Sequence, residues 1–143
     1  MYENNLVYKL FAQQKVVRNF LISYLNYILR SNTEKTSSSF IDYTQSLCVE
    51  LQVQFLSVEA AFSELNKTNS FVNKHNAFES VLAAYDSLAL LLANRKLPGE
   101  LYYNAEKLVN LYKVLLNKLT NNRLPSIAPY VSEMVLANNS ILR

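Results

Sequence analysis

The sequence of 143 residues is short of the residue types that build tight turns and reactive sites: it has one glycine, three prolines, one cysteine, one histidine and no tryptophan. Phosphate-binding loops and two-residue hairpins need backbone positions with φ > 0, which glycine supplies most readily. The single Gly99 therefore argues against nucleotide-binding folds and against β-sheets. Half of the residues are apolar, so the chain can bury a hydrophobic core, and its length fits one domain over residues 1–143.

The sequence also lacks the marks of secretion and of membrane insertion. The lone Cys48 cannot form an internal disulfide, and no stretch of about 18 consecutive apolar residues occurs. Charged residues at Glu3, Lys15 and Arg18 interrupt the apolar segment that a secretory signal would need. These features predict an intracellular, cytoplasmic protein with no integral membrane association.

What the sequence does have is apolar residues at alternating spacings of three and four, the pattern of one face of an α-helix. The clearest example lies in residues 101–119. Its stripe consists of Leu101, Ala105, Leu108, Tyr112, Leu115 and Leu119. Flanking apolar residues, including Tyr102, widen this stripe beyond what contact with one neighbour requires. The helix is therefore expected to pack against at least two others.

Similar patterns predict three more long helices, over about residues 4–29, 40–65 and 71–93. The segment Leu88–Leu92 is apolar nearly all round and is expected to be deeply buried. A short fifth helix is predicted to begin at Pro129, behind the break at residues 121–126. Helices of similar length joined by short polar loops favour antiparallel neighbours. We predict an all-α fold, an up-down antiparallel four-helix bundle with a short C-terminal fifth helix.

Catalytic and metal-binding patterns are missing. His75 and Glu79 are four residues apart, but one such pair is a weak signal, and Cys48 falls at the edge of an apolar stripe, as an inert core thiol would. No C-x-x-C, H-E-x-x-H or phosphate-loop motif occurs. We expect a protein that is not an enzyme and that uses no cofactor and no metal.

Apolar residues beyond the core stripes predict a surface that binds a partner. The helix over residues 40–65 carries a second stripe on its far side, bracketed by Asp42 and Glu64. This second stripe consists of Val49, Val53, Leu56 and Ala60. A second cluster, Tyr103, Lys107 and Val114, lies on the outer face of the helix over residues 101–119. Within one chain, the fifth helix or a skewed first helix could cover the second stripe, and the fifth helix could dock on the cluster around Tyr103. Otherwise both sets are partner-binding residues, because exposed apolar patches usually mark interfaces.

Charge is also unevenly distributed, although the formal net charge is only +3. Residues 3–30 contain four bases against Glu3, while residues 39–65 contain four acids and no base. The bases are Lys9, Lys15, Arg18 and Arg30. They either complement a neighbouring acidic helix or form a basic face for nucleic acid or an anionic membrane. The sequence thus predicts a non-catalytic interaction protein that self-associates or acts as an adaptor or subunit of a larger assembly. The alternative is a small nucleic-acid-binding subunit that uses these four bases.

Overall fold

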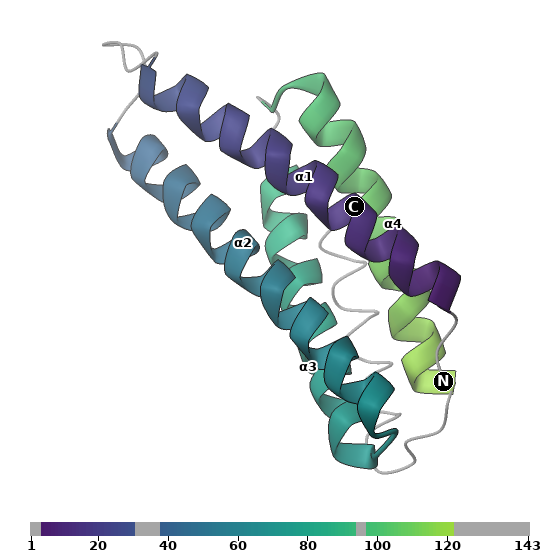
Figure 1. The fold of residues 1–143 in the computed structure, drawn as a ribbon. Coiled ribbons are helices and arrows are strands. Elements are labelled where there is room, and N and C mark those ends of the chain that lie inside the picture. Colours follow the sequence, from purple (N-terminus) through teal and green to yellow (C-terminus); the bar gives the residue numbers. More distant parts are fainter. Residues whose placement is uncertain (1–3, 31–37, 94–96, 122–143) are drawn as a thin grey trace.

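The computed structural model describes residues 4–30, 38–93 and 97–121, and within these ranges the chain forms four α-helices and no strand (Figure 1). The helices are α1 (Asn4–Arg30), α2 (Ser38–Lys67), α3 (Phe71–Leu92) and α4 (Gly99–Asn121). The predicted all-helical fold is confirmed. The fifth helix predicted from Pro129 lies outside the described residues.

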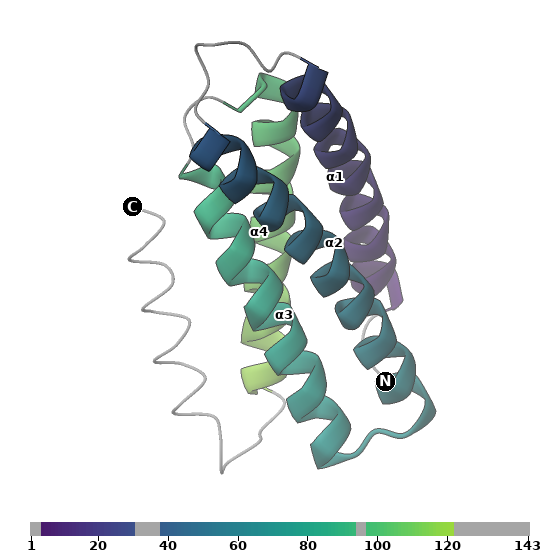
Figure 2. The ribbon, with the colours of Figure 1, turned by 90° about the vertical axis from the view of Figure 1, so that its left-hand side faces the viewer.

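Each helix packs against the next one along the chain, and α4 packs back against α1. The diagonal pairs, α1 with α3 and α2 with α4, make no close backbone contact in the described ranges. Figures 1 and 2 show the chain running alternately in opposite directions along the four helices, with α1 and α2 forming one side of the molecule. The first two helices therefore share a broad outer face that no other described helix covers.

The apolar stripes predicted from helical spacing form the core. All six residues of the stripe in α4, from Leu101 to Leu119, are buried, and so are Leu51, Phe55 and Phe62 of α2. Two expectations about α3 and α4 hold only in part: Leu88, Ala89 and Leu91 are buried, but Leu90 and Tyr102 are not. Leu90 is 50% exposed, although its segment is apolar nearly all round, because α2 and α4 are the only described helices that pack against α3. Tyr102 lies outside the core of α4 and is 41% exposed.

Local hydrogen bonds explain where the middle helices begin and end. The Ser70 hydroxyl accepts a hydrogen bond from the Asn73 backbone N–H at 3.1 Å, the arrangement of a helix N-cap. The Asn73 side-chain amide donates to the carbonyls of Thr68 at 2.7 Å and Glu64 at 3.2 Å. These bonds satisfy carbonyls at the end of α2, so α2 ends and α3 begins within a few residues. At α4, the Tyr102 N–H donates to the Pro98 carbonyl at 3.0 Å, which places the helix start directly after the proline.

Candidate interaction surface

A buried polar network lies between α1, α2 and α4. Gln14 is 1% exposed and occupies a gap in the apolar stripe of α1, between Leu10 and Val17. The Tyr112 hydroxyl of α4 donates a hydrogen bond to the Gln14 side-chain oxygen. The Gln14 amide nitrogen donates to the Phe55 carbonyl at 3.3 Å and to the Glu59 carboxylate at 3.4 Å, both in α2. Burial, and secondarily the charge of Glu59, raises the pKa of Tyr112, so this hydroxyl stays protonated and can donate.

Sequence analysis had not singled out Gln14. The signal that could have identified it is its position, because a polar residue at spacings of four and three within an apolar stripe must face the core. Such a residue needs a partner there, since an unpaired buried amide is costly. The network joins α1 to both of its neighbours by hydrogen bonds. It thereby fixes the height of α1, meaning its position along the bundle axis, relative to α2.

The second apolar stripe of α2, which we call the α2 stripe, consists of Val49, Val53, Leu56 and Ala60. Val49 is 50% exposed, Val53 57% and Leu56 59%, and Ala60 is exposed as well. No described helix covers these side chains, so a skewed first helix does not bury them; the predicted fifth helix lies outside the described residues. The α2 stripe is therefore a surface feature of the four described helices.

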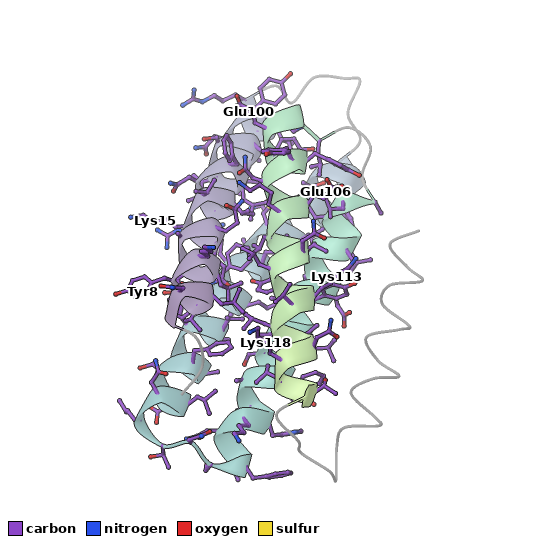
Figure 3. All side chains as sticks on the ribbon, turned by 90° about the vertical axis from the view of Figure 1, so that its right-hand side faces the viewer. Tyr8, Lys15, Glu100, Glu106, Lys113 and Lys118 are labelled. Carbon is purple, nitrogen blue, oxygen red and sulfur yellow. The ribbon has the colours of Figure 1, made fainter. Side chains whose placement is uncertain are left out.

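A groove of about 370 Å³ lies beside the α2 stripe, between α1 and α2. Leu56 and Glu59 line it from α2, and Lys15 and Arg18 line it from α1. Tyr8 stands at its edge and is 76% exposed. Figure 3 shows Tyr8 and Lys15 projecting from α1 on the side away from α4, which is the side that the shared outer face of α1 and α2 presents. Two of the predicted cations and part of the predicted apolar stripe thus meet at one groove.

The second predicted cluster lies elsewhere. The Lys107 ammonium is 5.5 Å from the centre of the Tyr103 ring, a cation–π distance. Lys107 and Val114 line a groove of about 490 Å³ between α4 and α1, together with Lys9. Because α2 and α4 are diagonal in the bundle, this groove and the α2 stripe are on different faces. The two sets that the sequence predicted as partner-binding residues thus lie on different faces of the four described helices.

The four predicted cations are likewise divided between surfaces. Lys9 lies toward α4, Lys15 and Arg18 lie toward α2, and Arg30 is exposed at the end of α1. Among the described residues, none of the four makes an ion pair. The acidic helix α2 is a direct neighbour of α1, yet it does not neutralise these charges within the chain.

The residues considered for catalysis are placed in ordinary surroundings. Cys48 is fully buried, and burial raises the pKa of its thiol to about 11, so the reactive thiolate is scarce at neutral pH. His75 Nε2 lies 3.8 Å from the Glu79 carboxylate on the surface of α3. Cys48 and His75 share no hydrogen bond or ion pair in the described part of the chain.

Two further findings describe the four helices, and one concerns relatives. Within the described ranges no helix is long and apolar enough to cross a membrane. The same residues contain no group of three histidine, cysteine or acidic side chains that could hold a metal ion. Comparisons with protein-family models, with curated proteins and with solved structures found no match to the chain.

Proposed function

We propose that the chain is a non-catalytic interaction protein that binds a protein partner, or a second copy of itself, through the α2 stripe. The observation that carries the proposal is the exposure of Val49, Val53 and Leu56, each at 50–59%, in one continuous row. Burying a large aliphatic side chain completely gains about 1.5–3 kcal/mol, of which each of these residues forgoes a part. Docking a partner on the row would recover that free energy.

The exposed valine and leucine of α3 do not form such a row. Val72 and Leu90 of α3 are exposed to a similar degree, but they lie at opposite ends of their helix. Scattered apolar residues are normal on protein surfaces, whereas contiguous ones usually mark an interface. This contrast also supplies a control of matched composition.

The test replaces Val53 and Leu56 with lysine. The double variant Val53→Lys/Leu56→Lys should keep its helical circular dichroism and its cooperative unfolding, while association measured by light scattering or by partner binding is lost. The control Val72→Lys/Leu90→Lys changes one valine and one leucine of similar exposure, and it should associate as the unaltered chain does. Unfolding of the α2 variant alone would show that the stripe belongs to the core, and the proposal would then be wrong.

A second candidate function is nucleic-acid binding through α1. The helix carries four cations that make no ion pair within the described residues, and its Tyr8 and Tyr27 are 76% and 65% exposed. Cations beside exposed aromatic rings can bind single strands by stacking and phosphate contacts. Fluorescence anisotropy with a labelled oligonucleotide tests this function. Binding that falls steeply with salt and with Lys15→Glu/Arg18→Glu would support it, and no binding at low salt would eliminate it.

A further inference from the structure

The two helices that border the exposed face carry opposite charges. In Asn4–Arg30, α1 contains the four bases and no acid. In Ser38–Lys67, α2 contains four acids, with Lys67 as its only base. Glu64 lies 3.5 Å from Lys67, but this exposed pair within one helix contributes little. The face shared by α1 and α2 is thus half basic and half acidic, and its opposite charges are not joined across the two helices in the described residues.

Contacts between α1 and α2 fix which residues lie at the same height. The rings of Phe11 and Phe62 are in edge contact, with centroids 6.4 Å apart. The helices are antiparallel, so each step forward along α1 is one step back along α2 (Figure 1). Counting from the Phe11–Phe62 contact, Lys9 lies at about the height of Glu64, and Arg30 lies within about one residue, or ~1.5 Å, of the height of Asp42.

These level residues are nevertheless separated within one chain. Lys9 lines the groove on the α4 side of α1, away from α2. Glu64 is four residues beyond Ala60 and so continues the outward-facing side of α2. The width of the helix pair therefore lies between Lys9 and Glu64 of the same chain. A second molecule, however, can bring them together.

Two copies can place this face on itself about a two-fold axis in two simple ways. An axis across the helices would set α1 on α1 and α2 on α2, with like charges opposed. An axis along the line between α1 and α2 would set each basic α1 on the acidic α2 of the other copy. Rotation about an axis parallel to the helices leaves heights unchanged. Lys9 would then face Glu64 of the second copy, and Arg30 would face Asp42 of the second copy.

We propose that the occupant of the α2 stripe is a second copy of this chain, docked about the two-fold axis along α1 and α2. This inference rests on the proposed function and names its partner. The basic α1 of each copy then lies on the acidic α2 of the other copy. The α2 stripe of each copy is covered by α1 of the other. Ala12 and Ala60, both exposed and at about the same height, allow the backbones to approach closely there.

The size of the face agrees with a stable dimer. The helices α1 and α2 contain 27 and 30 residues, so at a rise of ~1.5 Å per residue each is about 40 Å long. Two helices side by side are about 20 Å wide, which gives about 800 Å² per copy. Specific protein–protein interfaces typically bury about 800 Å² on each partner. An isologous dimer uses this one surface twice and closes on itself.

The test reverses the matched charges in two separate variants, Lys9→Glu/Arg30→Glu and Asp42→Lys/Glu64→Lys. Each variant alone opposes like charges at four places in the dimer, so its self-association, measured by analytical ultracentrifugation at low salt, should weaken more than tenfold. An equimolar mixture of the two restores every attraction, and it should form a heterodimer with an affinity within about threefold of that of the unaltered chain. Lys74→Glu/Lys113→Glu makes the same change in net charge as Lys9→Glu/Arg30→Glu, but on α3 and α4, and should associate normally.

The inference is overturned if the unaltered chain stays monomeric up to about 100 μM, if the reversed variants associate as tightly as the unaltered chain, or if mixing restores nothing. Its failure differs from failure of the proposed function. The latter would appear as unfolding of Val53→Lys/Leu56→Lys. If that variant folds and loses association while the charge-reversed variants behave like the unaltered chain, the α2 stripe remains an interaction surface but its partner is not a second copy docked in this way.

Discussion

Replacing Tyr112 with phenylalanine removes one hydroxyl from the centre of the bundle and keeps the ring in place. Tyr112 is 0% exposed and Gln14 is 1% exposed, so water cannot easily take the place of the lost donor. None of the other described residues donates to the Gln14 side-chain oxygen. A buried polar group left unsatisfied costs about 1–3 kcal/mol. We expect Tyr112→Phe to lower the free energy of unfolding by that amount.

Removing both polar partners should cost less than the two single changes together. Gln14→Met alone leaves the Tyr112 hydroxyl without its acceptor, whereas Gln14→Met/Tyr112→Phe leaves neither group of the pair unsatisfied. We expect a coupling of at least about 0.5 kcal/mol between the two positions. Urea unfolding followed by circular dichroism of the four proteins measures it. A loss below about 0.5 kcal/mol for Tyr112→Phe, or strictly additive losses, would refute the role assigned to this pair.

The pH dependence of this bond follows from the direction of the pKa shift. Because the pKa of Tyr112 is raised well above its usual value of 10.0 in the folded chain, the contribution of the hydroxyl is fully present below pH 10. It is lost as the pH rises further, since the unfolded chain ionises first. Below pH 9, the decrease in the free energy of unfolding caused by Tyr112→Phe should therefore not change with pH, as long as the rest of the fold is unchanged.

Two further predictions concern the core and the tail. Leu108→Ala and Leu115→Ala truncate fully buried side chains, and each should lower the free energy of unfolding, measured in urea, by about 2–5 kcal/mol. The half-exposed control Leu90→Ala should lower it much less. Losses below about 1 kcal/mol at both core positions would mean that this stripe is not the centre of the bundle. Truncation after Asn122 should leave cooperative unfolding intact, because the hydrophobic core that runs from Val7 to Leu119 lies within the four described helices. A truncated chain that melts without a cooperative transition would show that the tail belongs to the core.

The sequence was sufficient to predict the helices and most of their buried faces. Helical geometry fixes the direction of every side chain once the spacing is known, so the stripe of α4 could be assigned from its intervals alone. The same rule placed Val49, Val53 and Leu56 opposite the core stripe of α2, and their exposure confirmed it. These results depend on local geometry, which a single segment of sequence contains.

Other features depended on which helices are neighbours and at what height they meet. The periodicity of α3 could not show that no described helix covers Leu90, because that depends on where the other helices pack. The sequence showed that α1 is basic and α2 acidic, but not that their charges stay unpaired across the two helices, since a pairing also requires matching height and direction. Gln14 accepts a hydrogen bond from Tyr112 only because α1, α2 and α4 converge at this point. Distances between segments far apart in sequence are set by the packing of the whole core, which no single segment specifies.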